Sequence, residues 1–180
     1  MQSKQHQKAR LHLIGGNMTR NHRVLLGFVI LIFVFVSTPA LAEDHPVQLS
    51  LFTPIQIFPE DDTISGVRLN LLYGRNASVT GLDLGLINHT TTSISKGLQL
   101  GAVGWVDSDF VGWQDNSVNV VKGNFKGFQW GFVNYAKSAR GFQLGFVNYA
   151  ETMYGLQIGL LNIIRQDGVF PILPIINWSF

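Results

Sequence analysis

Apolar and polar positions recur with a fixed, short period along most of the chain. Three adjacent segments, which begin at Gly127, Gly141 and Gly155, align without gaps as Gly, apolar, Gln, apolar, Gly, apolar, apolar, Asn. Weaker copies begin at residues 66, 81, 97 and 112, so that successive copies start 15, 16, 15, 15, 14 and 14 residues apart. A period of this kind indicates a repeat architecture, in which every copy forms the same small structural unit.

Each copy is expected to form strand rather than helix. Phe128, Trp130 and Phe132 alternate with Gln and Gly positions, and a period of two is typical of a strand. Two glycines in about fourteen positions disfavour a helix. Polar segments such as 137–140 and 151–154 supply the turns between copies.

Glycine, glutamine and asparagine define the repeat, and we expect structural roles for them. These residues are Gly81, Gly97, Gly127, Gln129, Gly131, Asn134, Gly141, Gln143, Gly145, Asn148, Gly155, Gln157, Gly159 and Asn162. Three copies depart from this pattern. Arg68 and Asp83 stand at the Gln position, Asn70 replaces a second Gly, and residues 115–117 break the apolar middle of the copy at 112.

Two all-β architectures fit a strand and turn of this length. In a β-solenoid each unit is one coil, and equivalent positions stack about 4.8 Å apart. In a small up-and-down barrel of the outer-membrane type each unit is one antiparallel strand, and the alternating C-terminal segment 175–180 resembles the last strand of such barrels. The similarity of every unit to its immediate neighbour favours the solenoid, because successive antiparallel strands would repeat in pairs.

We therefore predict a β-solenoid of about seven 14–16-residue units. Its Gln side chains should form one ladder along the axis and its Asn side chains another, with amides bonded to each other. Residues 66–168 form the repeat domain in this interpretation. Residues 43–65 and 169–180, which carry prolines, form N- and C-terminal capping segments that protect the open ends.

The N-terminal segment has the features of a signal peptide. A run of 13 apolar or glycine positions, residues 24–36, follows Arg20 and Arg23 and precedes Ala40 and Ala42. A basic flank, a short apolar centre and small residues before the cut predict cleavage after residue 42. Residues 1–42 are then a signal peptide with a long first region, translation starting either at Met1 or at the internal Met18. An uncleaved membrane anchor is the alternative.

Charge and cysteine content exclude several classes of function. Without residues 1–42 the chain has 8 Lys and Arg against 11 Asp and Glu, a net charge of −3. It therefore lacks the basic surface that nucleic acids require. The absence of cysteine excludes disulfides and thiolate metal sites.

No catalytic, cofactor-binding or metal-binding residues are predicted. His45 and His89 have no second ligand at a metal-binding spacing and are interpreted as exposed turn residues. The acidic clusters 60–62 and 107–109 are interpreted as solvated turns, where Asp bonds to the backbone. The aromatic residues of the repeat are expected mainly in the core, and an exposed apolar stripe that contacts a partner or membrane is the alternative.

Residues 66–164 resemble a largely uncharacterised family of bacterial surface-repeat proteins, found in leptospiral and other Gram-negative genomes, which is built on the unit Gly-x-Gln-x-Gly-x-x-Asn. The resemblance implies export to the periplasm, outer membrane or cell surface, and it supplies no reaction or ligand. We expect a non-enzymatic envelope protein with a structural or interaction role, whose partner is an unknown protein or envelope surface. No cofactor or small-molecule substrate is inferred. A membrane-embedded barrel, acting as pore or scaffold, is the alternative.

Overall fold

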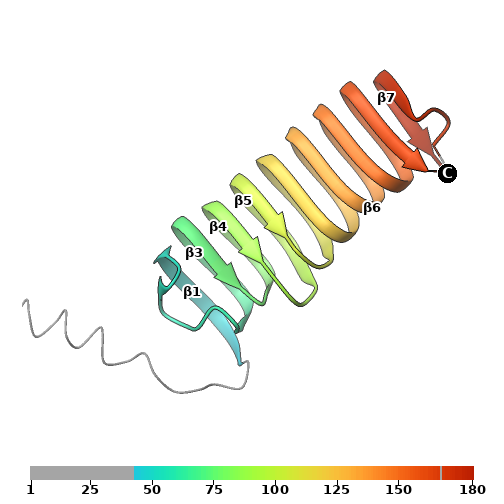
Figure 1. Ribbon diagram of the computed structural model, residues 1–180. Coiled ribbons are helices and arrows are strands. Elements are labelled where there is room, and N and C mark those ends of the chain that lie inside the picture. The colour runs from blue at the N-terminus through green and yellow to red at the C-terminus, as the bar shows by residue number, and fades with distance from the viewer. Residues whose placement is uncertain (1–42, 167) are drawn as a thin grey trace, which may run out of the picture. The chain divides into compact units, whose positions relative to one another are not determined.

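A computed structural model of the protein describes residues 43–166 and 168–180. The predicted signal peptide, residues 1–42, lies outside the described residues. The described chain is all-β and winds into a β-solenoid that ends in a separate strand (Figure 1). Its elements are β1 (Asp44–Phe52), β2 (Ile55–Gln56), β3 (Thr63–Asn76), β4 (Ser78–Thr90), β5 (Ser95–Val106), β6 (Phe110–Gln166) and β7 (Ile172–Ser179).

Successive units pair in parallel and in register. Gly66 stands opposite Gly81 in the β3–β4 pair, Gly81 opposite Gly97 in the β4–β5 pair, and Gly97 opposite Gly112 where β5 meets β6. Equivalent positions therefore stack from coil to coil, which confirms the predicted solenoid. The barrel alternative required antiparallel pairing between these units and is wrong.

β6 is one extended run that winds through several coils, as the continuous ribbon in Figure 1 shows. Within it, Gly141 lies directly against the carbonyl group of Gly127, and Gly155 against that of Gly141. The stacking seen between separate strands thus continues inside β6.

The first glycine of every unit occupies a backbone conformation that other residues rarely adopt. At the seven predicted unit starts φ lies between 117° and 157°. At Gly127, for example, φ is 138°, and an added Cβ would collide with the Gly112 carbonyl oxygen. Positive φ and close contact between coils together explain why glycine opens each unit.

The interior is divided into an apolar part and a polar part. The main apolar cluster consists of Val106, Phe110, Val121, Phe125, Ala136, Ala139, Ala150, Met153 and Ile164, and Ile64, Ala77 and Val79 are buried nearer the N-terminal end. Most of the buried polar positions hold Gln and Asn side chains, the majority of them 0–1% exposed. Backbone pairing between coils and hydrogen bonds between these amides therefore stabilise the polar half of the fold.

The two ends of the stack differ in their pairing. At the N-terminal end β1 pairs in parallel with β3 and carries the short antiparallel β2 on its other edge. At the C-terminal end β7 reverses direction and pairs antiparallel with the last coil of β6, with Gly159 opposite Ile175. The reversed strand covers an edge that would otherwise offer unpaired backbone groups.

Candidate functional site

A row of glutamine side chains runs through the interior. Gln157 donates its Nε2–H to Gln143 Oε1, and Gln143 donates in the same way to Gln129, both at 2.7 Å. The row continues through Gln114 and Gln99 with bonds of 2.8 Å. Every member is at most 1% exposed. The expected Gln ladder is therefore present inside the fold, and all of its amides donate toward the N-terminal end.

The two units that lack this Gln end the row with a buried ion pair. Gln99 Nε2 donates to Asp83 Oδ2 at 2.9 Å. Arg68 donates to both oxygens of Asp83, through Nε at 2.8 Å and Nη2 at 2.9 Å, and its Nη1 donates to the His89 carbonyl oxygen at 2.9 Å. Such a bidentate, fully hydrogen-bonded pair is the form in which charges are tolerated in an interior.

A second row, of asparagine side chains, runs beside the first in the opposite sense. Asn119 donates to Asn134 Oδ1, Asn134 to Asn148, and Asn148 to Asn162, each at 2.8 Å. Each Nδ2 also donates to a backbone carbonyl of the next coil, as from Asn134 to Leu144 at 3.0 Å. The Asn ladder therefore also bonds the side chains of one coil to the backbone of the next.

The unit that begins at Gly97 lacks the Asn of the repeat, and a side chain of the next unit takes its place. Gly104 stands at an Asn position, opposite Asn88 on one side and Asn119 on the other. Asn116, at the middle-Gly position of the next coil, fills the vacated space and donates to Asn119 Oδ1 at 2.7 Å. A Cβ on Gly104 would collide with Gln99 and crowd Asn116.

A similar replacement occurs in the unit that begins at Gly66. Gly74 stands opposite Asn88, and Asn70 donates to Asn88 Oδ1 at 2.8 Å in its place. An added Cβ at Gly74 would collide with the Asn70 side chain. Gly74 and Asn70 belong to one unit, whereas Gly104 and Asn116 belong to adjacent units. In the sequence, Asn70 and Asn116 stand out only as departures from the repeat, because the hydrogen bonds they make are not visible there.

The outside of the coils is apolar. We call outer apolar face the exposed side chains that the Gly-x-Gln-x-Gly-x-x segments carry, namely Leu69, Leu71, Leu72, Leu86, Trp113, Trp130, Phe132, Val133, Phe142, Phe146, Ile158, Leu160 and Leu161. Trp130, Phe132, Phe142 and Phe146 are 51–59% exposed. The expectation that the repeat aromatics pack mainly in the core is therefore wrong. They are exposed as in the alternative, whose contact with a partner or membrane stays a prediction.

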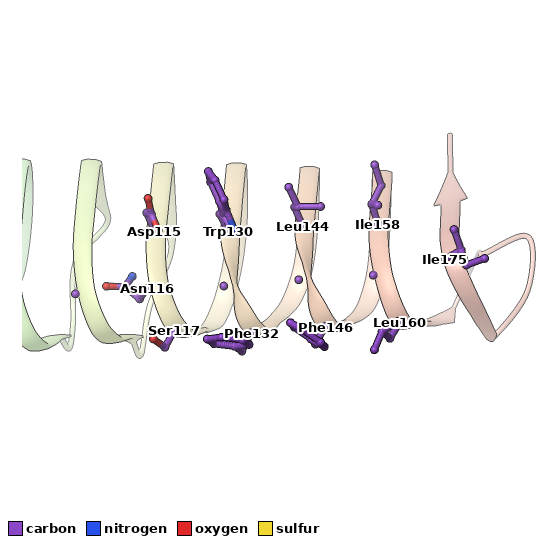
Figure 2. A pocket seen from close by; sticks show the side chains of 14 residues that line it. Asp115, Asn116, Ser117, Trp130, Phe132, Leu144, Phe146, Ile158, Leu160 and Ile175 are labelled. Carbon is purple, nitrogen blue, oxygen red and sulfur yellow. The ribbon is translucent and has the colours of Figure 1, made fainter.

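A groove runs along this face parallel to the solenoid axis. Figure 2 shows one wall formed by Trp130, Leu144 and Ile158 and a second wall formed by Phe132, Phe146 and Leu160. Its floor is the column of middle glycines, Gly131, Gly145 and Gly159. The groove has a volume of about 590 Å³, within the range of small-molecule sites.

The middle glycines are required for a reason different from the first ones. A Cβ on Gly145 would collide with the Gly131 carbonyl oxygen, and one on Gly159 with that of Gly145. None of the three floor glycines has a positive φ. Close approach between coils thus selects glycine here, and the missing side chains leave the floor of the groove open.

The histidines are partly buried and hydrogen-bonded, so their interpretation as exposed turn residues is wrong. His45 stacks on Phe58 with ring centroids 3.6 Å apart, and its Nε2 lies 3.0 Å from Asp62 Oδ2. His89 Nδ1 lies 2.8 Å from the Tyr73 hydroxyl, and its Nε2 lies 2.8 Å from Asp107 Oδ2.

The acidic clusters do lie in turns, but several of their carboxyl groups are held in contacts, as in Glu60 with Arg75 and Asp109 with Asn124. Asp62 is 1% exposed and is not solvated as expected. Burial raises the pKa of Asp107, but hydrogen bonds from Lys122, His89 and Trp105 outweigh it and lower the pKa to about 2. Asp107 thus remains ionised and paired.

No group of three His, Cys, Asp or Glu side chains able to hold a metal ion occurs in residues 43–166 and 168–180. Within the same ranges the structure has no helix long and apolar enough to cross a membrane. Comparison with known proteins found no matching family model, no matching curated protein and no matching solved structure.

Proposed function

We propose that the protein is an exported, non-enzymatic component of the bacterial envelope that attaches to the envelope through its outer apolar face. The observation that carries the proposal is the inverted distribution of side chains. Buried Gln and Asn rows fill half of the interior, whereas Trp130, Phe132 and Phe146 are more than half exposed. An apolar surface of this extent, repeated from coil to coil, is typical of an interaction site.

Positive charge lies along one border of the outer apolar face. Lys96, Lys126 and Arg140 each directly precede a unit-opening glycine and are exposed. Arg140 also lies over the ring of Tyr154, 5.0 Å from its centroid. Apolar side chains bordered by Lys, Arg and aromatic residues suit the boundary between acyl chains and anionic headgroups.

The contacts of the polar clusters support a non-enzymatic role. Both ring nitrogens of His89 are within 2.8 Å of partners, and the oxygens of Asp107 contact His89, Lys122 and Trp105. A general base or nucleophile must be free to meet a substrate. Here the groups hold neighbouring coils together instead.

Fractionation of cells that export the protein tests the proposal. We expect the protein in the envelope fraction, released by detergent, with Glu43 as its N-terminal residue. The double variant Phe142→Ser with Phe146→Ser should move to the soluble fraction. Phe170→Ser is the matched control, because Phe170 is equally exposed, at 52%, but lies outside the outer apolar face. A parent protein found in the soluble fraction would contradict the proposal.

A further inference from the structure

The groove on the outer apolar face has two different ends. One end is polar, where Asp115 and Ser117 stand in line with the two walls (Figure 2). No ion pair of Asp115 occurs among the described residues. At the other end Ile175 of β7 stands beyond Ile158 and Leu160. A ligand that matches both ends must be apolar along its length and polar at one tip.

Ile175 is held in a strained conformation at the apolar end. Its φ is 71°, in the left-handed region that β-branched residues avoid. Its side chain is 71% exposed, so burial of that side chain does not offset the strain. Strain of this kind is found where a side chain serves a site, and here it places an isoleucine opposite Gly159, at the end of the groove floor.

Backbone acceptors along one wall of the groove are already hydrogen-bonded to the interior. The carbonyl oxygens of Trp130, Leu144 and Ile158 along one wall accept hydrogen bonds from the interior Asn ladder, at 2.8, 3.0 and 2.9 Å. A bound peptide strand would have to leave its own polar groups unpaired against this wall, at a cost for each group. An alkyl chain has no such groups.

The length of the groove fits one acyl chain. From Ser117 to Ile175, which pairs with Gly159, the groove crosses four steps between adjacent strands of the stack, or about 19 Å at a spacing of about 4.8 Å. One leaflet of a bilayer has a hydrocarbon depth of about 15 Å, half of the whole core. A single extended lipid tail therefore fits between Ser117 and Ile175.

We propose that the groove binds one extended acyl chain of an amphiphile, whose cationic or hydrogen-bond-donating headgroup lies against Asp115 and Ser117. The inference rests on the proposed function, because the groove is part of the outer apolar face and the acyl chain would come from the envelope. The tail lies over the glycine floor between the two apolar walls. Ile175 covers its far end.

Calorimetric titration of the purified exported protein with hexadecylammonium, below its micelle concentration, tests the inference. We expect one bound molecule per chain and weaker binding of octylammonium and of hexadecanoate. Phe146→Ser should weaken the binding at least tenfold. Phe142→Ser is the matched control and should change it less than twofold, because Phe142 is 54% exposed against 53% for Phe146 but does not line the groove.

Two further variants test whether the two ends of the groove select the ligand or whether it binds by nonspecific apolar contact. Asp115→Asn should remove the preference for the ammonium headgroup over the carboxylate. Ile175→Gly should raise the melting temperature, because glycine accepts a φ of 71°, and should reduce the preference for the hexadecyl over the octyl chain. A stability gain together with a loss of chain-length selectivity is not expected of a purely structural residue.

Three results would overturn the inference. They are no binding of hexadecylammonium, an equal loss of binding in Phe142→Ser and Phe146→Ser, and dimers in light scattering that the Phe146 substitution dissociates. The last result would assign the groove to a second copy of the chain. Attachment to the envelope that persists while the titration shows no binding would contradict the groove site alone and leave the proposed function intact.

Discussion

Removal of one amide from the middle of the glutamine row is expected to destabilise the fold more than removal of one from its end. Gln143 donates to Gln129 Oε1 and accepts from Gln157 Nε2, at 2.7 Å in both cases. Gln143→Leu therefore leaves Gln129 Oε1 without a donor. It leaves Gln157 Nε2 with only the Ile163 carbonyl oxygen, 3.2 Å away.

The magnitude follows from the number of groups that lose a partner. A buried polar group left unsatisfied costs about 1–3 kcal/mol. Gln143→Leu leaves Gln129 Oε1 unsatisfied and reduces Gln157 Nε2 to one bond of 3.2 Å, so the expected loss of unfolding free energy is about 2–4 kcal/mol. In the Gln row, Gln157→Leu leaves one group, Gln143 Oε1, without its donor, and Gln157 Oε1 already has no hydrogen-bond partner. Each substitution also removes one long bond to a backbone carbonyl, that of Ile163 for Gln157 and that of Tyr149 for Gln143. The expected cost at the end of the row is about 1–2 kcal/mol.

Urea unfolding followed by circular dichroism measures both losses, since the free energy of unfolding falls linearly with urea concentration. Gln166→Leu is the matched control, because Gln166 is exposed, and it should stay within about 0.5 kcal/mol of the parent protein. Equal losses in Gln143→Leu and Gln157→Leu would refute the dependence of each amide on both neighbours.

Two more predictions follow from the interior and from the turns. Gly104→Asn and Asn116→Gly should each lower the free energy of unfolding. The double variant restores the unit pattern, so its loss in the same urea assay should be about 1–3 kcal/mol smaller than the sum of the two single losses. Additive losses would contradict the replacement of one side chain by the other. The pKa of Asp107 lies at about 2, below its ordinary value of 3.8, so its ionised form stabilises the fold above about pH 4 and loses this effect as the pH falls to about 2. Asp107→Asn should therefore flatten the acid side of the stability curve, and an unchanged acid side would speak against a stabilising role of this carboxylate.

The repeat made the solenoid predictable because each unit carries its own structural requirements. Gly127 and Gly141 mark starts at which φ is positive, and their spacing sets the length of a coil. The similarity of adjacent units correctly indicated parallel stacking. Once coils stack in parallel, Gln129 and Gln143 must meet, so the Gln row was predictable from the same period.

The contacts between unlike units could not be predicted in the same way. Asn116 occupies the space left by the missing side chain of Gly104, which lies one coil away. No pattern within either unit predicts this contact. The contacts of His89 with Tyr73 and Asp107 likewise join residues from three successive coils. Such contacts depend on which residues the stacking of the coils brings together.

The side of the strand that faces inward was also misjudged. Alternation shows that Phe128 and Trp130 share one face and that Gln129 lies on the other, but it does not say which face is buried. The tendency of apolar residues to be inside favoured the aromatic face. The better signal was the Gln repeated in five successive units, from Gln99 to Gln157, because hydrogen bonds between amides are stronger where water does not compete.

The direction of the amide rows is set by chemistry at one end. A carboxylate can only accept hydrogen bonds, so Asp83 requires Gln99 to donate toward it, as the 2.9 Å contact shows. Gln99 then presents its oxygen to Gln114, and the same orientation passes from coil to coil until Gln157, whose Oε1 has no partner. The Asn row donates in the opposite direction, so the side-chain dipoles of the two rows oppose each other. A single Asp at a Gln position thus orients the whole Gln row. Because the Gln and Asn side chains of the interior bond mainly to one another, the apolar side chains are left to face the surroundings.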